Sequence, residues 1–241
     1  FFEKKLGHAK PYISIFMFLI IFPIIITSNC NAAILGILGG CGLSLLFLVL
    51  NKFKKRKKIV IISILFFSIS IFSLLNILSK KYNSVVNSGQ NFIISTKILD
   101  AHRQIIWGFS FKEFKKKAIF GIGPDTSNFI EGSQEIISHP LTGDMPYIPS
   151  HPHNILVELL LETGIFGLVS FLLLIFSINY YFLRNKNFYN KIHIIFFNGY
   201  FWTSSLVNFS FWAAWWQGSY FLILTLLYSV SKYQMRKLNV D

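Results

Sequence analysis

The chain has 241 residues, of which 53% are hydrophobic and 17% aromatic, and this profile excludes an ordinary soluble domain. Its 23 lysines and arginines outnumber its 10 acidic residues, but most of them lie in short segments beside apolar stretches. Charges placed there set membrane topology and contact anionic lipids, and no RNA- or DNA-binding motif is present, so nucleic acid is excluded as a partner. The composition predicts an all-α integral membrane protein.

Six apolar stretches are long enough, or nearly so, to cross a bilayer whose hydrocarbon core is about 30 Å thick. In chain order they cover residues 12–27, 32–50, 59–78, 154–183, 192–212 and 215–231. We therefore expect about six transmembrane helices, three within residues 1–78 and three within 154–241, separated by a long polar loop at 79–153. In the second stretch Gly36 and Gly40 form a G-x-x-x-G motif, which predicts close packing against a neighbouring helix.

Basic segments alternate with uncharged turns along the chain. Lysine and arginine gather in residues 1–11, 52–58, 184–191 and 232–241, whereas the turns 28–31 and 213–218 contain none. Because positive charge marks cytoplasmic loops, this alternation predicts that all four basic segments are cytoplasmic and that residues 79–153 lie outside the cytoplasm. The chain begins Phe1-Phe2-Glu3 without an initiator methionine, which indicates a fragment of a longer protein.

The long loop carries a concentration of titratable side chains. Four of the six histidines lie in it, namely His102, His139, His151 and His153. Residues 96–117 are predicted to form a helix with one apolar face, and Arg103 and Trp107 lie one turn apart along this helix. Asp100 can reach Arg103 as an ion-pair partner.

Two glycines, Gly121 and Gly123, are predicted to end this helix and turn the chain. They do not form a dinucleotide-binding fingerprint, because no strand precedes them and no third glycine follows. Residues 125–150 are rich in Pro, Gly and Ser, so we expect an irregular lid or acceptor-binding loop.

The side chains of the loop suit group transfer from a lipid-linked pyrophosphate, since a site outside the cytoplasm has no nucleotide sugar available. A neutral histidine, with a pKa of about 6.5, can take a proton from an attacking hydroxyl. An arginine can hold two oxygens of a pyrophosphate leaving group as charge develops there. The acidic residues of the loop are scattered, which argues against a magnesium site, and we expect no metal and no cofactor.

Structural roles are open for the same histidines. His153 could have the purely structural role of capping the helix that Asn154 opens, since such caps are common at helix starts. The sequence His151-Pro152-His153 could supply two zinc ligands, with His139 as a third.

Other candidates have structural alternatives too. Arg103 could serve only as the partner of Asp100. Glu162 lies near the expected membrane interface, so a hydrogen-bonded carboxylate is as plausible there as a catalytic one. Gly164 and Gly167 are expected to be packing contacts rather than hinges.

Two stretches resemble the C-terminal half of the O-antigen ligase and polymerase superfamily, whose members build bacterial surface polysaccharides. The first reads H-N-I-L-V-E-L-L-L-E-T-G-I-F-G from His153 to Gly167, similar to the family's His-Asn and Glu-x-Gly-x-x-Gly signature. The second combines R-Q-I-I-W from Arg103 to Trp107 with the glycine pair of A-I-F-G-I-G-P. Order, spacing and membrane placement agree over about residues 100–170, and the resemblance implies a ligase-like domain over roughly 45–180.

The resemblance implies a metal-independent inverting glycosyltransferase in the bacterial inner membrane, with its loop facing the periplasm. The donor would be a glycan on undecaprenyl pyrophosphate, and the acceptor lipid A–core or another glycan. His153 would be the base that activates the acceptor hydroxyl, and Arg103 would engage the donor pyrophosphate. The further residues expected to bind substrate or support the site are Trp107, Gly121, Gly123, His151, Asn154 and Glu162.

Alternatives within the superfamily are an O-antigen polymerase and a protein O-oligosaccharyltransferase, which the sequence does not separate from a ligase. A membrane transporter is the alternative from another class, but the predicted spans contain few of the ionisable residues that it would need. One feature departs from the family, whose members carry a further periplasmic arginine in an earlier loop. Residues 28–31 contain none, so we expect that arginine in preceding sequence, and this chain by itself could be inactive.

Overall fold

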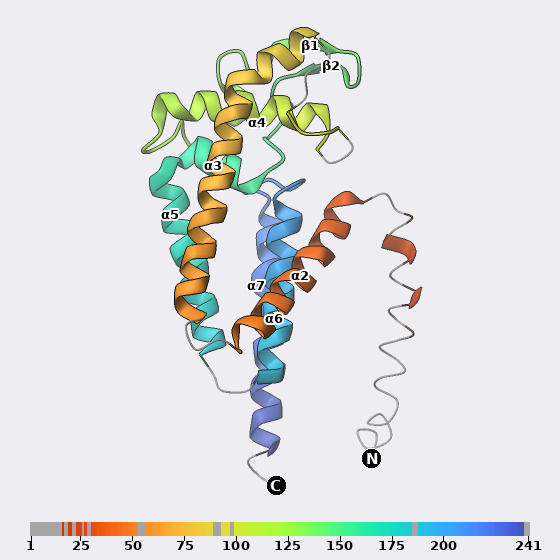
Figure 1. Ribbon diagram of the computed structural model, residues 1–241, viewed down its shortest axis with the longest axis vertical. Helices are drawn as coiled ribbons and strands as arrows, with labels where there is room; N and C mark the ends of the chain where they lie inside the picture. Colours follow the sequence, from red (N-terminus) through yellow and green to blue (C-terminus); the bar gives the residue numbers. More distant parts are fainter. Residues whose placement is uncertain are drawn as a thin grey trace.

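The structure is a computed structural model that describes residues 16, 19–20, 23–25, 27, 30–52, 56–88, 93–96, 99–184 and 188–238. Its long helices are α2 (Asn31–Leu50), α3 (Arg56–Ser88), α5 (Ile155–Leu183), α6 (Phe188–Ser205) and α7 (Ala214–Leu238). A layer built around α4 (Ala101–Phe114) lies across one end of them (Figure 1). In the same view α3 and α6 run toward this layer, while α2, α5 and α7 run away from it.

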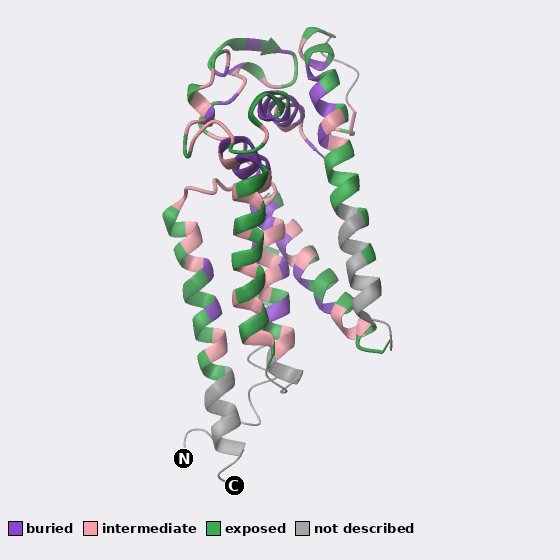
Figure 2. Cartoon of the chain, turned by 90° about the vertical axis from the view of Figure 1, so that its left-hand side faces the viewer, coloured by how far each residue is buried: buried purple, intermediate pink, exposed green. Residues whose placement is uncertain are grey.

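Two of the described helices, α2 and α5, are long and apolar enough to cross a membrane, with mean hydropathies of 2.5 and 2.4. Both were predicted as spans, whereas most of the first predicted span, residues 12–27, lies outside the described residues. Buried residues gather in the layer at the loop end, and the helices beneath it expose large apolar side chains (Figure 2). A chain that exposes its apolar surface in this way fits a membrane protein whose helices face lipid.

The predicted glycine contact in α2 is confirmed. A Cβ atom added to Gly40 would lie 2.9 Å from the carbonyl oxygen of Phe196, and one added to Gly39 would lie 2.8 Å from that of Gly199. The backbones of α2 and α6 therefore approach closely along this stripe, as small residues permit between membrane helices.

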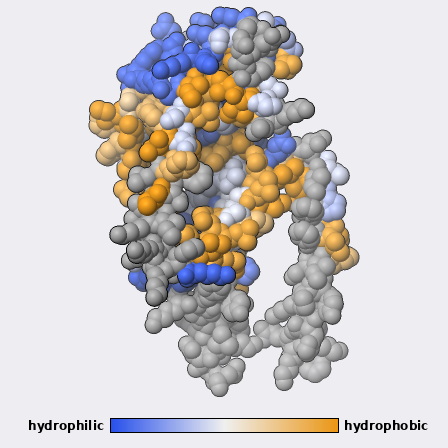
Figure 3. All heavy atoms as spheres, viewed as in Figure 1, coloured by the Kyte–Doolittle hydropathy of each residue, from blue (hydrophilic) through white to orange (hydrophobic). Residues whose placement is uncertain are grey.

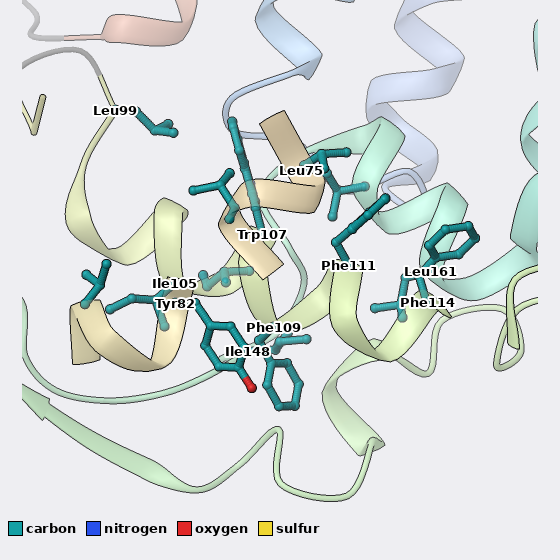
Figure 4. Close-up of a cluster of buried hydrophobic side chains, with 14 of the residues drawn as sticks. Leu75, Tyr82, Leu99, Ile105, Trp107, Phe109, Phe111, Phe114, Ile148 and Leu161 are labelled. Carbon is teal, nitrogen blue, oxygen red and sulfur yellow. The ribbon is translucent and has the colours of Figure 1, made fainter. Parts of the chain in front are cut away.

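The cross-lying helix α4 is buried on nearly every side. Its aromatic residues pack against the upper half of α3 and the first turns of α5 (Figure 4). Tyr82 and Val85 continue the apolar face of α3 beyond the predicted end of the third span at Leu78, so that helix runs ten residues further, to Ser88. This packing explains why the polar residues after Leu78 stay helical.

Two further predictions about the loop were wrong in detail. Helix α4 begins at Ala101 instead of residue 96, because the Asp100 carboxylate accepts a hydrogen bond from the Arg103 amide (2.8 Å) and so caps the helix. Residues 125–150 are not wholly irregular, since β1 (Ile136–His139) and β2 (Gly143–Pro146) pair antiparallel. The fold is thus mostly helical, which agrees with the predicted all-α class, and it adds one short hairpin in the loop.

Candidate functional site

Helix α5 breaks at Gly164, whose φ of 68° and ψ of −169° lie outside the helical region. The break leaves the carbonyls of Leu161 and Glu162 without partners inside the helix. They accept hydrogen bonds from the amides of Ile122 (3.2 Å) and Gly123 (2.9 Å). Buried backbone groups need such partners, so the turn after α4 completes the broken helix.

The turn after α4 also forms hydrogen bonds with the residues of α5 that follow the break. The amides of Ile165 and Phe166 donate to the carbonyls of Ala118 (2.9 Å) and Ile119 (3.1 Å). Four backbone hydrogen bonds thus join residues 118–123 to α5, and they fix the height of the loop layer along that helix.

Glycine is required on both sides of this junction. A Cβ atom added to Gly121 would lie 2.3 Å from the carbonyl of Glu162, and one added to Gly164 would lie 2.3 Å from the carbonyl oxygen of Ile119. Both glycines also have positive φ, which L side chains rarely adopt. The predicted packing role of Gly164 is confirmed, but the prediction missed the break in the helix.

Glu162 is 1% exposed, and its carboxylate holds two loop segments in place. Its oxygens accept hydrogen bonds from the amides of Asp125 (2.7 Å) and Ser127 (3.0 Å) and from the indole of Trp212. Of the two roles considered for Glu162, the structure shows the hydrogen-bonded carboxylate, and most of its partners are backbone amides of the protein.

Glu158, to which the sequence assigned no role, lies one turn earlier in α5 and also holds a neighbouring segment in place. It is 1% exposed, and it accepts hydrogen bonds from the Ser210 hydroxyl (2.7 Å) and the Phe211 amide. The spacing of four residues between Glu158 and Glu162 places both carboxylates on one face of α5, and this was the signal available in the sequence.

The segment that these carboxylates hold, residues 206–213, corrects the predicted fifth span. Helix α6 ends at Ser205 instead of residue 212, and α7 begins at Ala214, where an uncharged turn was predicted. The segment is apolar enough to resemble a continuing span, but its amides bond to side chains of α5 and to the Ser210 hydroxyl. We call residues 206–213 the outer turn.

Asn154 caps α5, because its side-chain oxygen accepts hydrogen bonds from the amides of Leu156 (3.0 Å) and Val157 (3.1 Å). His153 therefore does not cap this helix, and the structural alternative for it is wrong. Its backbone is left-handed, with φ of 53°, which is uncommon for a residue other than glycine. Its Nδ1 atom is buried and has no hydrogen-bond partner within the described residues.

Three histidines meet at this point. The ring of His153 lies 4.3 Å from that of His151 and 6.2 Å from that of His102, measured between centroids. The Trp107 indole donates to the carbonyl of Pro152 (3.0 Å) and so fixes the turn that carries two of them. His102 was not among the predicted site residues, since its place beside His153 depends on tertiary packing.

Burial sets the charge state of this cluster. Burial and then the neighbouring His151 lower the pKa of His153 to about 4, against an opposing effect of the Asn208 carbonyl. Burial also lowers the pKa values of His102 and His151. All three rings are therefore neutral near pH 7, which a proton acceptor requires.

Arg103, on α4, lies beside the same histidine cluster. Its guanidinium pairs with Asp100, as predicted, and its Nε atom donates to the carbonyl of Val207 (2.9 Å). The next carbonyl, of Asn208, lies 3.4 Å from the His151 Nε2 atom. Two successive carbonyls of the outer turn thus bring the arginine and the histidines together.

An open pocket of about 500 Å³ adjoins Arg103. It lies between the start of α2, the segment before α4 and the outer turn, and its lining includes Asn31, Thr96, Asp100, Arg103 and Asn208. With two of its five N–H groups engaged by Asp100 and Val207, the guanidinium has further donors to offer an anion there.

Among the residues that the structure describes, no three His, Cys, Asp or Glu side chains are arranged to hold a metal ion. His139 stands on β1, and its Nδ1 atom accepts a hydrogen bond from the Leu141 amide (3.2 Å). The alternative zinc site of His139, His151 and His153 is therefore not formed.

The fold and the site together define a helical membrane protein with histidine and arginine side chains gathered at one end of its helices. The chain belongs to the O-antigen ligase family, because the model of that family matches residues 16–172, well over half of the sequence. The expected resemblance is thereby confirmed.

The curated relatives are rickettsial proteins named as candidate polysaccharide ligases. The chain is 33% identical to the one from Rickettsia conorii over 143 residues, and 31% identical to the one from Rickettsia felis over 145 residues. Both matches cover 56% of this chain but only 33% of the relative, so the chain spans about a third of the length of these proteins. No solved structure matches the chain.

Proposed function

We propose that the chain forms the catalytic part of a polysaccharide ligase of the bacterial inner membrane. The donor is a glycan on undecaprenyl pyrophosphate, and the acceptor is lipid A–core. The observation that carries this proposal is that Arg103 and His151, whose ring lies against that of His153, both contact the outer turn, with Arg103 lining an open pocket. The names of the rickettsial relatives support the same class of reaction.

In the proposed reaction an acceptor hydroxyl attacks the anomeric carbon of the donor sugar with inversion. The bond from that carbon to the pyrophosphate oxygen breaks, and the electron pair leaves with the lipid pyrophosphate. His153 takes the hydroxyl proton, which its neutral state permits. Arg103 stabilises the negative charge that develops on the pyrophosphate.

A bound pyrophosphate also makes His153 a stronger base. A nearby anion favours the protonated ring, so it raises the histidine pKa from its low resting value. Donor binding thus brings the base closer to the pKa at which general-base catalysis is most effective.

The other predicted site residues take positioning roles in this proposal. Trp107 and Asn154 hold the turn and the helix start on either side of His153, and His151 lies against its ring. The loop layer is held against α5 by close contacts and hydrogen bonds that involve Gly121, Gly123 and Glu162.

Complementation tests the proposal directly. The full-length gene, as wild type and with His153→Ala or Arg103→Ala, is expressed in a bacterium lacking its O-antigen ligase, and lipopolysaccharide is separated on a gel. We expect a ladder from the wild type and none from either variant at equal membrane levels. A wild type without a ladder would point to a polymerase or a protein acceptor, and a ladder from His153→Ala would remove the proposed base.

A further inference from the structure

We propose that the outer end of α5 and the turn beside it form a docking surface for anionic phospholipid headgroups on the loop side of the membrane. The surface consists of an apolar wedge, Ile119, Phe120 and Phe166, and a lysine triplet, Lys115 to Lys117. It depends on the membrane placement in the proposed function, but not on glycan transfer.

The apolar wedge projects away from the protein. Ile119 is 66% exposed, Phe120 72% and Phe166 65%, and the two aromatic rings lie 5.9 Å apart. Ile119 and Phe120 form the tip of a tight turn, where a loop in water would carry polar side chains. An exposed apolar group of this kind marks a contact with lipid or protein.

The backbone fixes the wedge at the height of a membrane boundary. Beyond the break at Gly164, α5 continues to Leu183 and is followed by Arg184. At a rise of about 1.5 Å per residue this part is about 28 Å long, close to the hydrocarbon thickness of about 30 Å. Because Ile165 and Phe166 bond to the turn at residues 118–119, the wedge lies where the hydrocarbon ends.

The lysine triplet follows immediately on the side of the loop layer. It forms a short 3-10 helix, η1 (Lys115–Lys117), directly before the wedge. Within the described residues the one acidic partner of the triplet is Glu113, which pairs with Lys116 (2.6 Å), so the triplet keeps a net positive charge. Figure 3 shows hydrophilic atoms over this end of the molecule and hydrophobic atoms on the flank below them.

An open pocket of about 620 Å³ lies beside Lys116 and Lys117. Its lining combines charged and apolar side chains, namely Glu113, Lys116, Lys117, Ile122, Thr126, Phe129, Ile130 and Glu131. Lysines above an apolar wedge match a bilayer surface, where phosphate groups overlie acyl chains. This charge pattern favours anionic lipid over an apolar helix as the occupant.

Spin labels on the full-length protein in liposomes test this assignment. A background in which every cysteine of the full-length protein is replaced by serine, Cys30 and Cys41 included, receives a single labelled cysteine by Phe120→Cys. Leu173→Cys and Asp144→Cys provide the references, because Leu173 is exposed in the middle of the apolar half of α5 and Asp144 is exposed on the hairpin. We expect the label at position 120 to be accessible to oxygen, at a depth between the two references.

Two other results at position 120 would overturn the proposal. Full access to a water-soluble nickel complex would place the turn in water. Protection from both oxygen and nickel would mean that protein covers the wedge, either a further part of a longer chain or a second copy.

The lysines are tested by lipid composition. In liposomes containing phosphatidylglycerol we expect the label at position 120 to lie deeper than in pure phosphatidylcholine. The double change Lys116→Gln and Lys117→Gln should abolish that difference. A depth that is unaffected by the lysines or by the anionic lipid would refute the headgroup contact.

Discussion

Replacement of Gly164 by alanine is expected to destabilise the protein strongly, because two independent costs fall on this residue. Its φ of 68° and ψ of −169° lie in a region that is nearly exclusive to glycine, at a cost of about 1–3 kcal/mol for other residues. The new Cβ would stand 2.3 Å from the Ile119 carbonyl oxygen, so the two backbones must separate. Separation weakens the two hydrogen bonds just beyond the break, each contributing about 1 kcal/mol.

Together these terms give a loss of about 3–5 kcal/mol, against a usual total stability of about 5–15 kcal/mol. For a domain of 150–250 residues the loss corresponds to a fall of roughly 6–20 °C in the unfolding midpoint, and the fall becomes smaller as the chain becomes longer. Thermal unfolding of the full-length protein in detergent, followed by tryptophan fluorescence, measures it.

Gly42→Ala is the matched control. Gly42 lies in α2, and a Cβ added there would meet no atom within 4 Å. Alanine is favoured over glycine inside a helix by about 0.5–1 kcal/mol, so this variant should melt at or slightly above the wild type. If Gly164→Ala melted together with Gly42→Ala, the break in α5 would not require glycine, and the derived junction with the loop would be wrong.

Four further outcomes follow from the site. The pH profile of kcat/KM should fall on the acid side near pH 4, the pKa of His153 in the free protein. The profile of kcat should fall at a higher pH, because bound pyrophosphate raises the pKa of His153. If both profiles fell at the same pH, the bound pyrophosphate would not raise this pKa. Arg103→Lys should lower transfer about 100-fold at unchanged unfolding temperature, since lysine lacks the planar fork; an active variant would show that a single charge suffices. Glu162→Gln should cost about 1–3 kcal/mol in thermal unfolding, because an amide nitrogen would face backbone N–H groups, and a neutral change would contradict its role in holding the loop. Metal chelators should leave glycan transfer intact. If a chelator inhibited transfer and added zinc restored the activity, His151 and His153 would have a metal-binding role.

Local patterns in the sequence were enough to predict several parts of the site. The start of α5 at Asn154 and the ion pair of Arg103 with Asp100 depend on neighbours a few residues apart, and the spacing of the glycines that α2 uses to contact a neighbouring helix is equally local. Short-range spacing determines such features, because a helix repeats every 3.6 residues and a cap acts within one turn.

Long-range contacts account for what the sequence did not show. The end of α6 was misplaced because the outer turn is as apolar as a span, and two of its groups, the Phe211 amide and the Trp212 indole, find their partners on α5, some fifty residues earlier in the chain. The extension of α3 to Ser88 depends on packing against α4, and the break at Gly164 depends on the turn at residues 118–123. Hydropathy and propensity carry no record of such partners.

The outer turn contacts the proposed site residues and both buried carboxylates of α5, in large part through its backbone atoms. Arg103 donates to the carbonyl of Val207, while His151 approaches that of Asn208. Glu158 and Glu162 hold the following residues from α5. Since carbonyl and amide groups are common to nearly all residue types, this segment can position the arginine and the histidines without a recognisable motif. The spacing between His153, the proposed base, and Arg103, the proposed pyrophosphate ligand, is therefore set by the helix break and the two buried carboxylates, and it should change with them.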